Sequence, residues 1–273
     1  MLKAVVTDLD GTLLDKNHLL SEYTKNTLNK FLNKGYKLYI ATGRVERGTR
    51  LISDQLNHKL PLITTNGARI VDENGEQIFS VTLNEKCTNF ILNLDYKKYG
   101  KEIFINGYSG TDWFVVSEEY KEFYSKKRKD KIFGGTVLTQ EEFAKKKFNK
   151  LFFIGNFENL KKMRDVLIKE IGSHANIDFV SENSLEIFDL STNKYEASLK
   201  LLKRDGIDPS EVIAFGDGLN DYLMLNGFNT SFVMENALQE LKDLLPNKPV
   251  IEDSDTNSVA RKIEEVFNLW KEP

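Results

Sequence analysis

The sequence predicts an α/β fold in which a doubly wound, mostly parallel sheet is interrupted by a separate inserted α/β region. Three observations support this prediction. Short buried-strand patterns alternate with amphipathic helical patterns at both ends of the chain. Several of these strands lead directly into polar turns that contain glycine. The middle of the chain instead alternates short aromatic strands with charged helices and has no such turns.

Composition limits the possible partners. The chain has 273 residues, which is enough for one large or two modest domains with hydrophobic cores. Its charged residues amount to 29% and its formal net charge is −3, so nonspecific nucleic-acid binding is disfavoured. One cysteine, Cys87, excludes an internal disulfide. Neither a signal peptide nor an apolar run of membrane-spanning length is found, and we expect a cytoplasmic protein with no nucleic-acid or membrane partner.

The first predicted strand, residues 2–7, leads into the acidic motif DLDGT at residues 8–12. Open α/β sheets bind ligands at the carboxyl ends of their strands, where these two carboxylates would lie. A carboxylate can attack phosphorus when a divalent cation offsets the charge of the phosphate. Asp8 would then be the nucleophile and a metal ligand, Asp10 the group that moves protons, and Thr12 a group that orients Asp10. The alternative is a solvated turn with a chance acidic pair.

A second strand, glycine turn and helix follow the acidic motif. Ser21 and Gly35 are suited to cap the two ends of a helix. Residues 37–41 predict a strand that runs into Thr42-Gly43-Arg44, and a helical pattern extends to residue 56.

The third repetition is a predicted strand over residues 62–65 that leads into Asn66-Gly67-Ala68. Residues 69–71 and 77–81 flank a turn that suits a hairpin. The exits of parallel strands converge on one edge of a doubly wound sheet. Asp8, Thr42 and Asn66 could therefore face a common ligand.

The middle of the chain is predicted to form a separate α/β unit. We expect a core made of residues 1–82 and 191–273 and an inserted domain made of residues 83–190. The loop at residues 108–113 either presents an aromatic ring and a carboxylate to a small organic phosphate or forms a hairpin turn. The predicted elements of the inserted domain are strands over 102–107, 113–116, 151–155, 178–181 and 185–190, and helices over 86–99 and 160–171.

A second acidic cluster follows a late strand. Residues 212–215 predict a buried strand that ends in Asp217, and two flanking glycines allow the backbone to bend toward a cation. Asp221, one helical turn further on, can support Asp217. The remaining predicted elements are a helix over 195–204 that Gly206 stops, a strand over 230–234, a helix over 237–245, a strand over 250–251 and a last amphipathic helix that reaches Trp270.

Taken together, these motifs resemble one known family. DLDGTLL at residues 8–14, ATGR at 41–44, TNGA at 65–68, the lone Lys194 and GDGLND at 216–221 are similar to the motifs of the haloacid dehalogenase superfamily, and more narrowly to those of its Cof-type phosphatases. The resemblance covers essentially the whole chain. It implies a Rossmann-like core, a large α/β cap inserted between the second and third motifs, and Mg²⁺ as the cofactor.

The resemblance also implies roles for individual residues. Asp8 would be nucleophile and Mg²⁺ ligand, Asp10 the acid/base and a ligand through its backbone carbonyl, and Asp217 the remaining carboxylate ligand. Asp221 would support these ligands from behind. The groups that bind the phosphate would be the Leu9 amide, Thr42, the Gly43 amide, Lys194 and the Asn220 side chain.

Three positions carry alternatives. Tyr195 stands where the family commonly has glycine after its lysine, so the local backbone at Lys194 is in question. Asn66 either contacts the ligand or only orients its neighbours. Arg44 either forms a salt bridge to the C-terminal core or contacts substrate.

The predicted function is a Mg²⁺-dependent phosphatase of small phosphorylated metabolites that works through an aspartyl phosphate on Asp8. Within the Cof-type group, the segments around residues 65–69 and 234–244 look like those of sugar-phosphate and pyridoxal-phosphate phosphatases. The alternatives are a phosphomannomutase-like phosphotransferase and a non-catalytic protein that binds phosphorylated metabolites. A mutase usually needs several basic cap residues, and Arg128 and Arg164 are the two arginines of residues 83–190. We expect a monomer or a weak homodimer.

Overall fold

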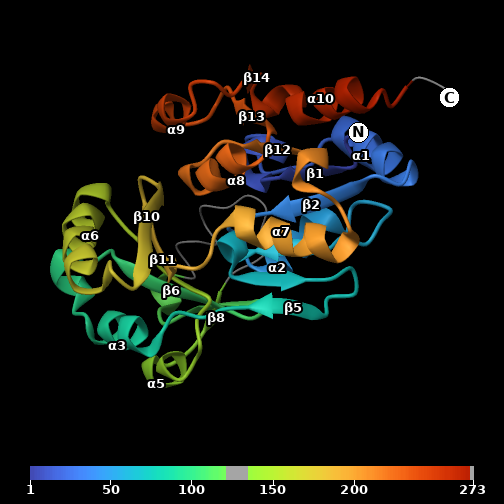
Figure 1. Ribbon diagram of the computed structural model, residues 1–273. Helices are drawn as coiled ribbons and strands as arrows, with labels where there is room; N and C mark the ends of the chain where they lie inside the picture. The colour runs from blue at the N-terminus through green and yellow to red at the C-terminus, as the bar shows by residue number, and fades with distance from the viewer. Residues whose placement is uncertain (121–134, 271–273) are drawn as a thin grey trace. The chain divides into compact units, whose positions relative to one another are not determined.

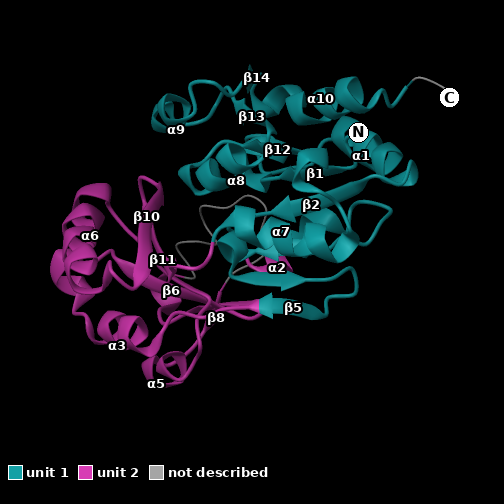
Figure 2. Ribbon diagram, in the orientation of Figure 1, with its two compact units in different colours: residues 1–44, 49–79, 193–273 teal, residues 45–48, 80–192 magenta. Residues whose placement is uncertain are grey.

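The computed structural model describes residues 1–120 and 135–270, and the chain divides into two compact units (Figures 1 and 2). Unit 1 comprises residues 1–44, 49–79 and 193–273, and unit 2 comprises residues 45–48 and 80–192. The predicted core had included residues 45–48. They group with unit 2 because Val45 packs in an aromatic cluster of that unit, against residues such as Phe104 and Trp113.

The sheet of unit 1 has eight strands in the order β14-β13-β12-β1-β2-β3-β4-β5 (Figure 1). The strands from β14 through β3 are parallel to their neighbours, and β4 is antiparallel to β3. The predicted α/β class with a mostly parallel sheet is therefore confirmed. The strands are β1 (Ala4–Thr7), β2 (Lys37–Ala41), β3 (Leu62–Thr64), β4 (Arg69–Val71), β5 (Gln77–Ser80), β12 (Val212–Gly216), β13 (Thr230–Met234) and β14 (Val250–Ile251).

Helices cover both faces of this sheet because successive side chains of a strand point to opposite sides. Val5 packs in one buried cluster with Phe31 and Ile263, whereas Val6 packs in another with Leu201. The first cluster draws on α1 and α10, and the second draws on α7 and α8. The helices are α1 (Glu22–Asn33), α2 (Glu46–Ser53), α7 (Lys194–Asp205), α8 (Tyr222–Gly227), α9 (Gln239–Leu244) and α10 (Ser258–Phe267).

The predicted helix caps are present. The Ser21 side chain accepts a hydrogen bond from the Thr24 amide at the start of α1, and Gly35 follows the helix with φ of +86°. Gly206 ends α7 in the left-handed conformation. The last helix is shorter than predicted, because Asn268 turns left-handed and ends it before Trp270.

Unit 2 contains a six-stranded sheet in the order β10-β11-β9-β6-β7-β8, antiparallel except where β8 joins β7. Its core lies between this sheet and helices, with Ile105, Phe153 and Leu167 in one cluster. The strands and helices are β6 (Phe104–Ser109), β7 (Asp112–Val115), β8 (Thr136–Val137), β9 (Lys150–Ile154), β10 (Ala175–Ser181), β11 (Ser184–Asp189), α3 (Glu85–Asn93), α5 (Gln140–Ala144) and α6 (Phe157–Ile171).

Several predictions for the inserted region change. The helix predicted to reach Tyr99 ends at Asn93, because Leu94 is extended and a separate short turn follows it. β8 and α5 were not predicted, since each is too short to show a periodic pattern. The loop at residues 108–113 is a hairpin turn between β6 and β7 with Gly110 at φ of +61°. Arg128 lies outside the described residues.

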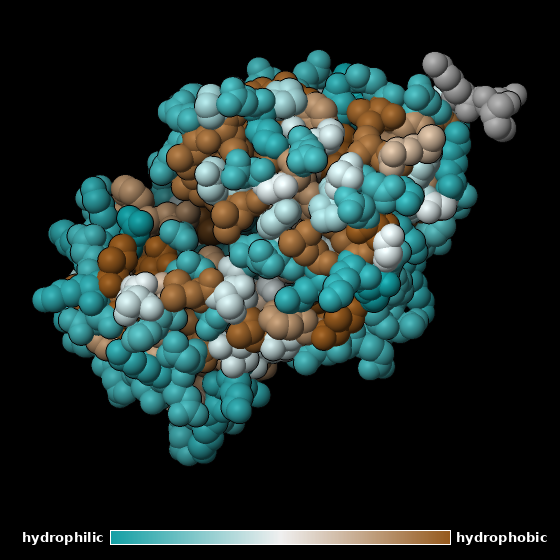
Figure 3. Space-filling view, viewed as in Figure 1, coloured by the Kyte–Doolittle hydropathy of each residue, from teal (hydrophilic) through white to brown (hydrophobic). Residues whose placement is uncertain are grey.

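The surface is mixed in character. Figure 3 shows hydrophobic residues interspersed with hydrophilic ones over the face that it presents. Leu223, Leu238 and Leu244 are among the exposed apolar side chains of unit 1. Single exposed apolar residues are ordinary in folded proteins. In residues 1–120 and 135–270, no helix is both long enough and apolar enough for a membrane span.

Candidate active site

Asp8, Lys194 and Asp221 form the buried centre of the site. Asp8 directly follows β1, and its amide donates to the Phe215 carbonyl of the neighbouring β12. The Lys194 Nζ lies 2.6 Å from Asp8 Oδ1 and 2.6 Å from Asp221 Oδ1. Lys194 is 1% exposed, and Asp221 is fully buried. Residues 186 positions apart in the sequence thus share one ion-pair network.

Asp217 completes an acidic group with Asp8 and Asp221. Ligand oxygens of these three residues lie within 4.8 Å of one another. The Thr12 hydroxyl donates to Asp217 Oδ1 at 2.7 Å. Thr12 was expected to orient Asp10, and the structure places it on the other acidic motif instead. The first and last motifs of the chain are therefore directly joined.

The electrostatics of this acidic group fit a divalent cation. Burial raises the pKa of Asp8 well above its usual range; Lys194 opposes this shift, and the neighbouring Asp221 and Asp217 carboxylates add to it. Burial and the Asp221 charge raise the pKa of Asp217 to about 7. Crowded carboxylates of this kind are relieved by a hard cation, for which carboxylate oxygens are the preferred ligands.

Asp8 and Asp217 are the better candidates for direct metal ligands. Both oxygens of Asp221 already have partners, because Oδ1 accepts from Lys194 and Oδ2 accepts from the Asp217 and Gly218 amides at 3.1 and 3.0 Å. Asp221 therefore shapes the loop that carries Asp217. This geometry supports the supporting role that was expected for Asp221.

Gly11 allows the two acidic motifs to approach closely. Its φ is +77°, and a Cβ at this position would lie 2.3 Å from Asp217 Oδ2. The carbonyl of Gly11 also accepts a hydrogen bond from the Asn236 side chain at 2.7 Å. A side chain at residue 11 would therefore displace a candidate metal ligand.

We expect Gly11→Ala to lower the free energy of unfolding by more than the roughly 1–2 kcal/mol that a left-handed alanine costs, and to reduce activity at least about tenfold. Gly35→Ala is the matched control, because Gly35 has φ of +86° and no neighbour within 4 Å of an added Cβ. Urea titrations and steady-state rates of the two variants measure the difference. Equal stability losses with full activity in Gly11→Ala would refute the close-approach explanation.

Asn66 connects the second and fourth motifs. Its Oδ1 accepts from Asn220 Nδ2 at 3.0 Å, and its backbone amide donates to the Thr42 carbonyl at 2.9 Å. An added Cβ on Gly43 would lie 3.0 Å from the same Asn66 oxygen. The candidate phosphate-binding residues Thr42, Gly43 and Asn220 are thus gathered around a buried Asn66, which supports the orienting role among the two alternatives.

Arg44 takes neither of its predicted roles in the contacts that the structure gives. Its guanidinium binds the Asp10 carboxylate through Nε to Oδ2 at 2.6 Å and Nη2 to Oδ1 at 2.5 Å. His18 Nδ1 lies 2.7 Å from the same Oδ1. Although burial alone would raise it, the contacts with His18 and Arg44 hold the pKa of Asp10 below its usual range. Asp10 is therefore ionised in this arrangement.

Sequence reasoning missed His18. The chain contains three histidines, and one of them lies only eight residues after Asp10. That proximity was the available signal, but a histidine in a polar loop is not specific enough to be recognised from the sequence alone.

Tyr195 does not distort the backbone at Lys194. Asn193 caps α7 by accepting from the Glu196 amide, and Lys194 and Tyr195 are its first helical residues. The Tyr195 ring fits because Gly227 has no side chain; a Cβ there would lie 2.5 Å from the ring. The tyrosine is therefore accommodated by a second change on α8.

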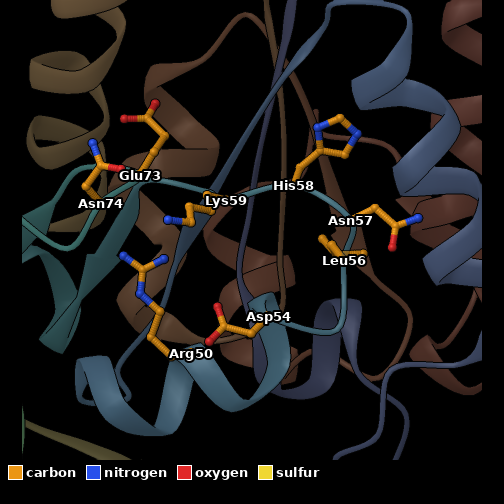
Figure 4. Close-up of a pocket in the computed structure, with 8 residues that line it drawn as sticks. All are labelled: Arg50, Asp54, Leu56, Asn57, His58, Lys59, Glu73 and Asn74. Carbon is orange, nitrogen blue, oxygen red and sulfur yellow. The ribbon is translucent and has the colours of Figure 1, made fainter.

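A separate open cavity of about 470 Å³ lies in unit 1 away from these residues. Figure 4 shows Arg50 and Asp54 reaching it from α2. The Arg50 guanidinium donates to the Leu60 and Asp72 carbonyls, which makes it a structural brace of the loop before β3 and of the β4–β5 turn. No residue of the acidic group lines this cavity.

Comparison with known proteins identifies the family. The family model described as haloacid dehalogenase-like hydrolase matches residues 5–263, which include both acidic motifs. The chain belongs to this hydrolase family. The order and spacing of the motifs are thus those of a family whose members are built over the same length of chain.

Individual relatives agree with this assignment. The hydrolase is 32% identical over 271 residues to a "Putative phosphatase" of Buchnera aphidicola (subspecies Baizongia pistaciae), covering 98% of this chain and 99% of that protein. It is 27% identical over 263 residues to the HMP-PP phosphatase of Klebsiella pneumoniae, covering 95% and 94%. A solved structure from Plasmodium vivax, described as HAD/COF-like, superposes with a TM-score of 0.86 at 24% identity over 98% and 96% of the two chains.

These findings confirm three predictions from the sequence. The chain is a haloacid dehalogenase-like hydrolase of Cof type, its fold is that of the family, and it is a phosphatase. The phosphatase class favours neither the mutase nor the non-catalytic alternative. The individual site roles, the identity of the cation and the substrate are matters of proposal.

Proposed function

We propose that this hydrolase is a Mg²⁺-dependent phosphatase of small phosphorylated metabolites and that it works in the cytoplasm. The observation that carries the proposal is the buried group of Asp8, Asp217 and Asp221 around Lys194, since it combines a nucleophile, a cation site and a charge partner. Asp8 and Asp217 would hold the cation, together with the Asp10 carbonyl. When bound, the cation offsets the charge between Asp8 and the phosphate dianion.

The first chemical step is the attack of an Asp8 carboxylate oxygen on phosphorus. The Lys194 ammonium donates to Asp8 Oδ1, so this contact keeps the carboxylate ionised and orients it. The bond from phosphorus to the leaving oxygen breaks, the leaving oxygen takes a proton from Asp10, and an aspartyl phosphate remains on Asp8. Thr42, Gly43 and Asn220, gathered by Asn66, would bind the phosphoryl oxygens with the Leu9 amide and Lys194.

The second step is hydrolysis of the aspartyl phosphate. Asp10 accepts a proton from the attacking water, phosphate leaves, and the Asp8 carboxylate is restored. The ionised state of Asp10 suits this base role. For the acid role, one contact with Arg44 must be given up, and the contact to Oδ2 is the single one.

Release of phosphate from a substrate panel tests the proposal. The panel contains sugar phosphates, pyridoxal phosphate, HMP-PP and nucleotides, because the family resemblance suggests the first two and one relative is named for the third. We expect turnover with Mg²⁺ that EDTA abolishes and that excess Mg²⁺ restores. Undiminished turnover in EDTA would exclude the metal role. Phosphoryl transfer from a bisphosphate without net phosphate release would instead support a mutase.

A further inference from the structure

We propose that His18 is a positioning residue that fixes the Asp10 carboxylate and thereby selects which of its oxygens exchanges the proton. This inference rests on the proposed role of Asp10 as acid/base. His18 has no assigned role in the chemistry described above. Its imidazole is 48% exposed, and the Asp10 side chain is 37% exposed, so both can be reached by solvent and small molecules.

The two oxygens of Asp10 are held unequally. Oδ1 has two partners, Arg44 Nη2 at 2.5 Å and His18 Nδ1 at 2.7 Å, whereas Oδ2 has Arg44 Nε at 2.6 Å. If the Oδ2 contact is given up for proton transfer, His18 and Nη2 still hold Oδ1. Without His18, the carboxylate would be held only by the guanidinium and could pivot with it. The proton would then be carried in less defined geometry.

The backbone at His18 indicates that the imidazole is the reason for this residue. His18 has φ of +60°, a conformation that glycine adopts without cost and that other residues adopt infrequently. The loop that imposes this conformation is well braced. Asp15 Oδ1 accepts from the Asn17 and Leu19 amides, and the Lys16 amide donates to Asp255 at 2.8 Å. A residue retained under such strain commonly has a functional side chain.

Glycine at this position separates function from folding. His18→Gly removes the imidazole and relieves the left-handed strain, so its midpoint of thermal unfolding is expected to stay within a few degrees of wild type. The matched control is His58→Ala, because the His58 side chain contacts Asn33 and not the acidic group.

The test measures the single-turnover rate of leaving-group release from two substrates. One is the best alkyl phosphate of the panel, whose leaving oxygen needs a proton; the other is p-nitrophenyl phosphate, whose leaving group does not. For His18→Gly we expect a loss of about 10–100-fold with the alkyl phosphate and less than about threefold with p-nitrophenyl phosphate. Free imidazole is expected to restore part of the lost rate, and His58→Ala is expected to behave as wild type.

Other outcomes overturn either the inference or its basis. Equal losses on both substrates, or no loss, would refute the positioning role of His18 while leaving the phosphatase proposal intact. If wild type itself released no leaving group from either substrate in Mg²⁺, the proposed function would fail, and the inference would fail with it.

Discussion

Asp8→Asn is expected to abolish turnover, with a fall in kcat of about 10⁴-fold or more, and to raise the midpoint of thermal unfolding in metal-free buffer. The rate falls because an amide cannot form the phosphoryl ester that the carboxylate forms. The stability rises because the folded pKa of Asp8 lies above its unfolded value. An ionised Asp8 at neutral pH therefore costs folding free energy, which the neutral amide avoids.

The opposite signs of these two effects make the experiment informative. Steady-state phosphate release and differential scanning calorimetry of wild type and variant, both in EDTA and in Mg²⁺, measure them. In Mg²⁺ the advantage of the variant is expected to shrink, because the wild type gains a bound cation and the variant loses a ligand. Turnover near the wild-type rate in Asp8→Asn would exclude Asp8 as the nucleophile.

Lys194→Met is expected to lower the free energy of unfolding by about 3–5 kcal/mol in metal-free buffer, the usual effect of removing one partner from a buried ion-pair network. Burial alone would lower the pKa of Lys194, but the Asp221 and Asp8 carboxylates hold it above its usual range. The ammonium therefore stabilises the fold. Without it, three carboxylates share a buried space with no cation from the protein.

The loss in Lys194→Met is expected to be partly reversed by Mg²⁺, since a bound cation supplies the missing positive charge. Urea titrations with and without Mg²⁺ measure this reversal. Lys203→Met is the matched control, because Lys203 is exposed on the same helix and is expected to change stability by less than about 0.5 kcal/mol. A loss in Lys194→Met no larger than that of the control would show that Lys194 does not balance the acidic group.

Strand exits were the most predictable part of the molecule. β2, β13 and β14 have the bounds expected from their apolar runs, and Asp8 and Asp217 follow their strands as expected. A buried strand bounded by a glycine turn is specified by local sequence. The ends of α3 and α10 were less predictable, because the extended Leu94 and the left-handed Asn268 end them within patterns that remain apolar.

Contacts between motifs could be predicted as groups but not as pairs. The sequence indicated that the acidic motifs, Thr42 and Asn66 would converge, because parallel strands end at one edge. It did not indicate that Thr12 would bind Asp217, or that Arg44 and His18 would both bind Asp10. These pairings depend on side-chain reach and on the left-handed backbone at His18, neither of which a spacing rule contains.

The most direct test of an aspartyl phosphate on Asp8 is to trap it. Asp10→Asn removes the base for hydrolysis, and p-nitrophenyl phosphate needs no acid, so the phosphorylated enzyme is expected to accumulate. Acid quenching after a burst of nitrophenol, followed by borohydride reduction and peptide mass spectrometry, is expected to find up to one modified residue per chain, at Asp8. A burst with the label on another residue, or nitrophenol and phosphate released together with no modified Asp8, would contradict the mechanism.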